Sequence, residues 1–206
     1  MLFSIRPMTR DDVPHAIELQ KSAFPPPFSE DLHWEPEHLY RHIKIFPQGQ
    51  FVAEAAGQIV GSCSNALISE EGWLAHGSWG ATMGGPFIRK FDGNGSTLYG
   101  LDITVEPGAR RVGIGRAFYA CRYQLVEELG LKRYGTGCRI PDYRSFAAEN
   151  PSIDVHAYAN KVVAGEAVDR TLTPLLRYDL TFLGVIENYM EDLESANAGA
   201  LLERVR

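Results

Sequence analysis

Three arginines and two glycines gather in one short segment, in the order Arg110, Arg111, Val112, Gly113, Ile114, Gly115 and Arg116. Glycine lets backbone N–H groups approach a ligand closely, and arginine adds positive charge. If a helix begins here, its first N–H groups are free and its dipole favours an anion. The spacing Arg-x-x-Gly-x-Gly therefore indicates an anion site that a pyrophosphate would fit.

A strand and a helix are predicted on either side of this segment, the 110–116 loop. The β-branched residues Ile103, Thr104 and Val105 predict a strand, which ends at Pro107 and Gly108. Apolar residues then follow helical spacing up to Gly130, a typical helix end, at Ala117, Phe118, Cys121, Leu125 and Leu129. The alternative is a plain strand-to-helix turn that uses glycine only for its conformation.

Two common phosphate motifs do not match the 110–116 loop. The dinucleotide fingerprint requires a third glycine, and the spacing from Gly113 puts Phe118 at that position. The phosphate loop of nucleotide hydrolases requires Gly-Lys-Ser/Thr, which does not follow here. Dinucleotide binding and simple nucleotide hydrolysis are therefore disfavoured.

The loop resembles motif A of the GNAT superfamily of N-acetyltransferases, which has Arg/Gln-x-x-Gly-x-Gly/Ala between a strand and a helix. This resemblance implies that Arg110 to Arg116 bind the pyrophosphate of acetyl-coenzyme A. It also implies that the main chain of the preceding strand, at Ile103, Thr104 and Val105, pairs with the pantetheine arm. Further phrases resemble the acetyltransferase domain often fused to carbon–nitrogen hydrolases: residues 131–133, 139–143, 161–166 and 187–189.

The expected fold is α/β (α+β), with a mixed, mainly antiparallel sheet flanked by helices and a splayed strand pair at the cofactor site. Residues 1–206 are expected to form one acetyltransferase domain, since this length is typical of a single domain. Periodicity and turn residues predict helices near 13–24, 35–46 and 155–163, and further strands at 2–7, 51–55, 58–67, 133–139, 182–186 and 198–205. The strand at 133–139 is expected beside the cofactor strand.

Residues 69–97 form a long connection in which seven glycines interrupt tryptophan and phenylalanine residues. Long glycine-rich loops in compact domains often act as lids or binding loops. One interpretation is a cover that excludes water from the acceptor. The alternatives are a segment that packs against its own body and one that contacts a second subunit in a homodimer.

The chemistry implied by the resemblance needs a neutral amine, a polarised carbonyl and a proton for the departing thiolate. Asp102 and Glu106 are candidate bases, and Tyr143 and Tyr178 compete as the acid. A surface salt bridge is the structural alternative for Asp102. Cys138 is a less favoured candidate nucleophile, because small buried cysteines are common. The N-terminal aromatics Phe24, Phe28, Trp34 and Tyr40 are candidates to line the acceptor cleft.

The composition excludes several other classes of protein. A net charge of -6 and a pI near 5.5 disfavour general nucleic-acid binding, which relies on a basic surface. No segment has the length or apolar character of a membrane helix or a signal peptide. Three widely spaced cysteines and the scattered histidines show no metal-ligand spacing and predict no metal site. A reduced, cytoplasmic location is expected.

The resemblance implies acyl-coenzyme A-dependent N-acyltransfer (EC 2.3.1 type), with acetyl-coenzyme A as the expected cofactor. It also implies that the acceptor, an unidentified primary amine on a small molecule or a peptide, attacks directly in a ternary complex. One alternative is a coenzyme A-binding sensor without turnover. Another is a partner-binding module whose interface is the 69–97 segment.

Overall fold

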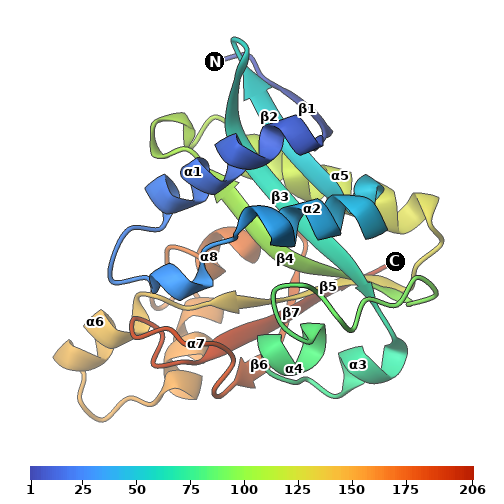
Figure 1. Ribbon diagram of the computed structural model, residues 1–206. Coiled ribbons are helices and arrows are strands. Elements are labelled where there is room, and N and C mark those ends of the chain that lie inside the picture. Colours follow the sequence, from blue (N-terminus) through green and yellow to red (C-terminus); the bar gives the residue numbers. More distant parts are fainter.

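A seven-stranded sheet in the order β1-β2-β3-β4-β5-β7-β6 forms the centre of the computed structural model, which describes residues 1–206 (Figure 1). Only β4 and β5 run parallel, and all other neighbours are antiparallel. The expected mixed, mainly antiparallel sheet is confirmed. The strands are β1 (Ser4–Pro7), β2 (Gln50–Ala55), β3 (Gln58–Ile68), β4 (Thr97–Val105), β5 (Arg133–Arg139), β6 (Thr181–Ile186) and β7 (Gly199–Val205).

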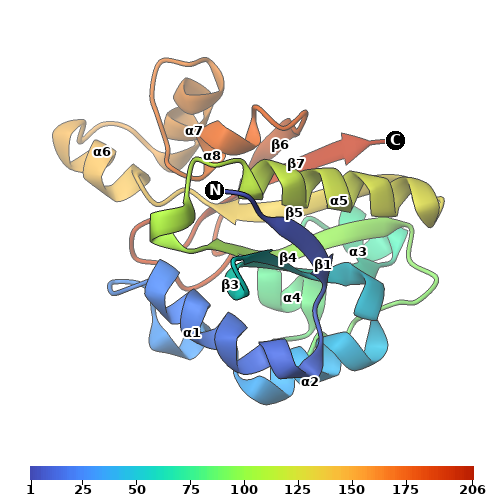
Figure 2. The same ribbon diagram turned by 90° about the horizontal axis from the view of Figure 1, so that it is seen from above.

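Helices cover both faces of the sheet (Figure 2). On one face lie α1 (Val13–Ala23) and α2 (Pro36–Ile45), and on the other lie α5 (Ile114–Glu128), α7 (Val155–Val163) and α8 (Leu172–Leu175). The remaining helices are short: α3 (Glu70–Leu74), α4 (Trp79–Met83), α6 (Tyr143–Glu149) and 3-10 turns at Arg10–Asp12, Glu30–Leu32, Pro47–Gly49 and Pro107–Ala109. None of the helices combines the length and apolar character needed to cross a bilayer.

The helix after the 110–116 loop begins and ends where the sequence predicts. Gly130 adopts a φ of 63°, and the N–H of Leu131 donates to the carbonyl of Val126 at 2.9 Å, which closes a Schellman motif. The predicted buried stripe is wrong in part, because Leu129 is 39% exposed and Arg122 is buried instead. The buried face of α5 is therefore rotated toward Tyr119, Arg122 and Val126.

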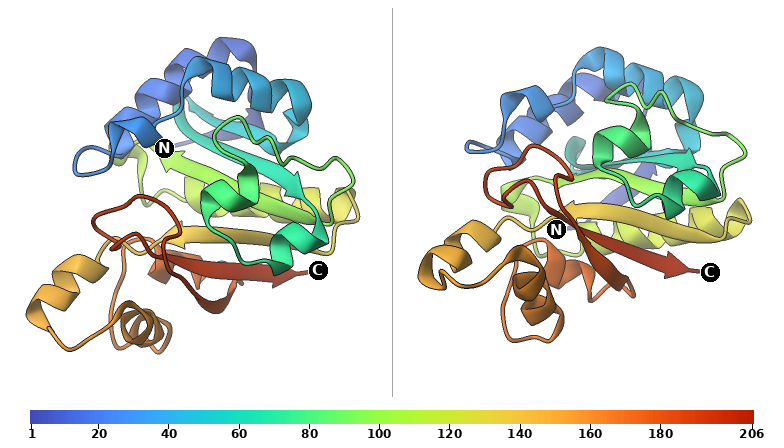
Figure 3. Two further views of the ribbon diagram at one scale, coloured as in Figure 1. Left: turned by 60° about the horizontal axis from the view of Figure 1, so that its bottom comes forward. Right: turned by 90° about the horizontal axis from the view of Figure 1, so that it is seen from below.

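The 69–97 segment packs against the body of the protein (Figure 3). It contains α3 and α4, and its residues Trp73, Met83 and Ile88 are buried in one cluster with Tyr99 of β4 and Leu201 of β7. The ring of Trp73 lies over Gly135 of β5, where any side chain would collide with it. Packing on its own body accounts for these three residues, whereas Trp79 and Pro86 of the same segment line the cavity described below.

Replacing Gly135 with alanine tests whether this packing stabilises the fold. A Cβ at Gly135 would lie 2.6 Å from Cη2 and 2.8 Å from Cε3 of Trp73, so the indole must shift. Because overpacking a core is destabilising, we expect Gly135→Ala to lower the free energy of unfolding by about 1–3 kcal/mol in urea denaturation. Gly80→Ala is the control, since a Cβ there contacts nothing. Equal stability of both variants would contradict this packing.

Candidate functional site

Strands β4 and β5 separate soon after they pair (Figure 3). They are hydrogen-bonded neighbours only from Thr97 to Tyr99 and from Arg133 to Gly135, although both strands continue beyond these residues. At the same point β4 has a bulge against β3, because Ser64 pairs with Asp102 and Asn65 pairs with Gly100, which leaves Leu101 without a partner. This is the splayed strand pair that the resemblance implies, and it opens a gap in the sheet.

Side chains take over the hydrogen bonds that the ladder loses at this gap. The hydroxyl of Thr136 donates to the carbonyl of Gly100 at 3.1 Å, and Nη2 of Arg122 donates to the carbonyl of Asp102 at 2.8 Å. On the other strand, the hydroxyl of Tyr189 donates to the carbonyl of Gly137 at 3.2 Å. Buried carbonyls need such partners, so these side chains stabilise the separated strands.

The gap leads into a cavity of about 230 Å³. Its wall includes residues 100–103 of β4, residues 136–139 of β5, and Phe24, Phe28 and Trp34 from the segment around α1 and α2. These three aromatics are among those that the sequence predicts to line a cleft. Tyr40 does not line the cavity, because its ring packs under the guanidinium of Arg10 at 4.1 Å.

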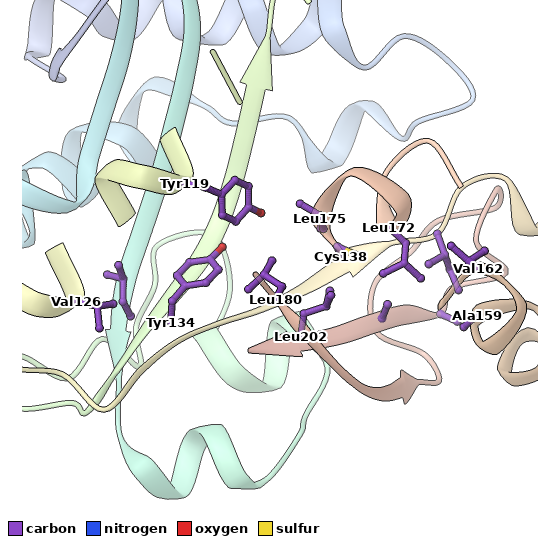
Figure 4. Packing of buried hydrophobic residues seen from close by; sticks show 14 of the residues in the cluster. Tyr119, Val126, Tyr134, Cys138, Ala159, Val162, Leu172, Leu175, Leu180 and Leu202 are labelled. Carbon is purple, nitrogen blue, oxygen red and sulfur yellow. The ribbon is translucent and has the colours of Figure 1, made fainter. Parts of the chain in front are cut away.

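Two titratable groups in the cavity wall have raised pKa values. The carboxylate of Asp102 accepts a hydrogen bond from the Thr104 hydroxyl at 3.0 Å, and burial raises its pKa. Burial also raises the pKa of Tyr119 far above its usual value, so the phenol keeps its proton. Figure 4 shows Tyr119 and Tyr134 where β4 and β5 separate. The cavity thus holds a carboxylate and a phenolic donor.

Cys138 also lines the cavity, but its environment does not suit a nucleophile. Burial is the largest influence on its thiol and raises its pKa. A thiol is nucleophilic as the thiolate, which this environment disfavours. Cys138 is therefore best described as part of the cavity wall.

The other candidate proton-transfer residues lie outside the cavity wall. The hydroxyl of Tyr143 donates to the carbonyl of Ile153 at 3.4 Å. Tyr178 packs its ring 4.9 Å from that of Tyr119, and its hydroxyl lies 3.7 Å from where a Cβ on Gly115 would be. Tyr178 thus bridges the 110–116 loop and the cavity wall. Glu106 lines a separate polar cavity.

The 110–116 loop presents free donors at the start of α5. None of the backbone N–H groups from Arg111 to Arg116 donates within the protein, and the first to do so is that of Ala117, to Gly113 at 3.0 Å. Gly113 has a φ of 98°, and a Cβ there would contact nothing. The guanidinium of Arg110 donates to the carbonyl of Ala23 at 3.2 Å and fastens the loop to the end of α1. This arrangement fits a polyanion such as a pyrophosphate.

The sequence interpretation missed several residues of the site: Tyr119, Arg122 and Thr136. Arg122 left a signal, because it lies four residues from both Phe118 and Val126, on the face of α5 that the fold buries. A charged residue on the buried side of a predicted helix usually has a polar partner or a function. Thr136 left no comparable signal, since threonine is common in strands.

No protein-family model matches the chain. The uncharacterized N-acetyltransferase YkwB of Bacillus subtilis (strain 168) is 36% identical over 200 residues, which cover 97% of this chain and 87% of that protein. The probable hydrolase YhcX of the same organism is 32% identical over 97% of this chain, which spans only 38% of that protein.

Solved structures show the same fold at lower sequence identity. The loading GNATL domain of CurA from Lyngbya majuscula superposes with a TM-score of 0.83 at 20% identity, covering 100% of this chain and 98% of that one. The GNAT-like decarboxylase GphF, in complex with isobutyryl-coenzyme A, gives 0.78 at 22% identity, covering 98% of each chain. Taken with the similarity to YkwB, the chain belongs to the GNAT superfamily and is an acyl-coenzyme A-dependent N-acyltransferase.

Proposed function

We propose that the protein transfers an acetyl group from acetyl-coenzyme A to a primary amine bound in the 230 Å³ cavity. The observation that carries this proposal is the separation of β4 from β5 beside a loop of free N–H groups. Tyr178 connects the two features, because it lies against both Gly115 and Tyr119. The anion site and the cavity wall at the gap are thus in contact with the same tyrosine.

The residues present fit both the pyrophosphate and the pantetheine arm of coenzyme A. The N–H groups from Arg111 to Arg116 and the exposed arginine side chains would hold the pyrophosphate at the positive end of α5. The unpaired edge of β4 at Ile103, Thr104 and Val105 would hold the pantetheine arm through backbone hydrogen bonds. The thioester supplies an activated acyl group, and binding of isobutyryl-coenzyme A by GphF supports this ligand class.

Residues in and beside the cavity wall would handle the protons of the reaction. Asp102 would accept a proton from the incoming ammonium, directly or through water, because a carboxylate with a raised pKa is a stronger base. Tyr119 would donate a hydrogen bond to the departing sulfur, because its raised pKa keeps the phenol protonated, and Tyr178, whose ring packs on it, is the candidate that supplies the proton. Tyr143 has no contact with the cavity and takes no part in this scheme. The amine would attack directly in a ternary complex.

Gly113→Glu tests the 110–116 loop. Its carboxylate would repel the pyrophosphate and occupy the open space at Gly113. Because a charged hydrogen bond is worth about 1.5–3 kcal/mol, we expect the affinity for acetyl-coenzyme A to fall at least about tenfold in calorimetric titration. Gly165→Glu is a matched control, since Gly165 also has a positive φ (77°) and open space around it, after α7. Unchanged affinity in Gly113→Glu would show that the loop does not bind the cofactor.

Asp102→Asn tests the base and separates catalysis from folding. A base acts when it is deprotonated, so wild-type kcat/KM should rise with pH through the raised pKa of Asp102. In the variant, this rise should disappear and kcat/KM should fall by about 10²-fold or more, measured as thiol release from acetyl-coenzyme A with an amine panel.

The stability of Asp102→Asn provides an internal check. A carboxyl with a raised pKa in the folded state stabilises the fold when protonated, and loses this stabilisation as the pH rises through that pKa. Asparagine stays neutral, so at pH 7 the variant should be at least as stable as the wild type. Asp31→Asn, an exposed carboxylate in the same cavity wall, should retain activity. Full activity of Asp102→Asn would exclude Asp102 as the base, and binding of acetyl-coenzyme A without any thiol release would favour a sensor.

A further inference from the structure

Arg122 is a buried cation with an unused pair of donors. The side chain is 1% exposed, and its Nε donates to Oδ1 of Asn65 at 2.8 Å. Its Nη2 donates to the carbonyls of Asp102 at 2.8 Å and Ser64 at 3.4 Å. No group of the protein accepts a hydrogen bond from Nη1. Two of the five N–H groups of this guanidinium are therefore free.

No carboxylate of the protein forms an ion pair with Arg122. Asp102, the acidic residue beside it, attracts the guanidinium through space, but its carboxylate accepts a hydrogen bond from Thr104 and not from Arg122. The rings of Tyr119 and Tyr134 lie 4.9 and 5.2 Å from the guanidinium and stabilise its charge in part. Buried charges are normally paired through direct hydrogen bonds, and the hydrogen-bond partners of Arg122 are all neutral, so its guanidinium can still accept a directly bonded anion from outside the protein.

Arg122 is one of the residues that line the 230 Å³ cavity, together with Gly100 and Thr136 at the point where β4 and β5 separate. The other arginine of the wall, Arg139, is neutralised by Asp192 at 2.7 Å and Glu194 at 2.8 Å. Much of the remaining wall is apolar, with Phe24, Phe28 and Trp34. Arg122 is thus the cation that can select a charged group inside the cavity.

We propose that the substrate bound in this cavity carries a carboxylate that accepts hydrogen bonds from Nη1 of Arg122. A carboxylate suits this free nitrogen, because a hydrogen bond between two charged groups is about twice as strong as one between neutral groups. This inference rests on the proposed acyl transfer and names the substrate class of the same cavity. The carboxylate belongs either to the acyl group of the thioester or to the amine acceptor, as in an amino acid.

Two matched pairs of compounds distinguish these sources. In each pair an isopropyl group of similar shape replaces the carboxylate. For the acyl group, the affinity for malonyl-coenzyme A is compared with that for isovaleryl-coenzyme A by calorimetric titration. For the acceptor, thiol release from acetyl-coenzyme A is measured with glycine and with isobutylamine. A new hydrogen bond to a charged group predicts a preference of about tenfold or more for the carboxylate in one of the two arms.

Arg122→Met shows whether the preference depends on this residue. The ratio within the preferred pair should fall to about one, and a ratio does not depend on the fraction of protein that is folded. Arg133→Met is the control, because Arg133 is a partly buried arginine outside the cavity wall, paired with Glu70 at 2.9 Å. This control should keep the wild-type ratio.

The result that overturns the inference differs from the one that overturns the proposed function. If wild-type protein binds coenzyme A but neither arm favours the carboxylate, including the case in which neither amine reacts, Arg122 does not select the substrate. A preference that persists in Arg122→Met also refutes it. If coenzyme A itself does not bind, the proposed function fails first.

Discussion

The separation of β4 from β5 is the constraint on which the rest of the structure depends. Neighbouring strands of a sheet form hydrogen bonds between their backbone N–H and carbonyl groups. A gap inside a sheet therefore leaves carbonyls that need other hydrogen-bond donors. Thr136, Arg122 and Tyr189 supply them by donating to Gly100, Asp102 and Gly137. The gap therefore requires polar side chains in the core, and these are the residues that line the cavity.

This requirement connects stability with chemistry. A buried arginine whose Nη2 donates to a carbonyl also buries its charge, and Nη1 of Arg122, a residue of the cavity wall, has no protein acceptor. Its neighbour Tyr119 is buried by the same packing and remains protonated for that reason. Burial of Asp102 raises its pKa in turn. The packing around the gap thus also sets the pKa values of Tyr119 and Asp102.

Local patterns in the sequence predict much of the fold, because the elements that frame the site have strong local signals. Glycine at 113 and 130 marks both ends of α5, and β5 begins and ends at the predicted residues. The buried side of α5 is only partly predictable: the spacing of Arg122 from Phe118 and Val126 indicates which side it faces, but its polar partners come from distant strands. The 69–97 segment is also only partly predictable. Its glycines suggest an irregular loop, but the burial of Trp73 against distant strands anchors it to the sheet. The sequence pattern does not distinguish Tyr143 from Tyr178 as the acid. In the fold, Tyr178 packs against Tyr119 of the cavity wall, whereas Tyr143 donates to Ile153.

The cavity wall is assembled from distant segments that are fixed to one another. The N–H of Trp79 donates to the carbonyl of Tyr189 at 2.9 Å, and Nε2 of His42 is within hydrogen-bond distance of the carbonyl of Pro86 at 2.8 Å. Arg139 ties the end of β5 to Asp192. Because these bonds restrict the segments, little ordering is left for the moment of binding, and preorganised sites lose less affinity to conformational entropy. Selectivity in such a site comes from the groups that the fixed wall presents, so one unpaired guanidinium has more influence here than it would on a mobile loop.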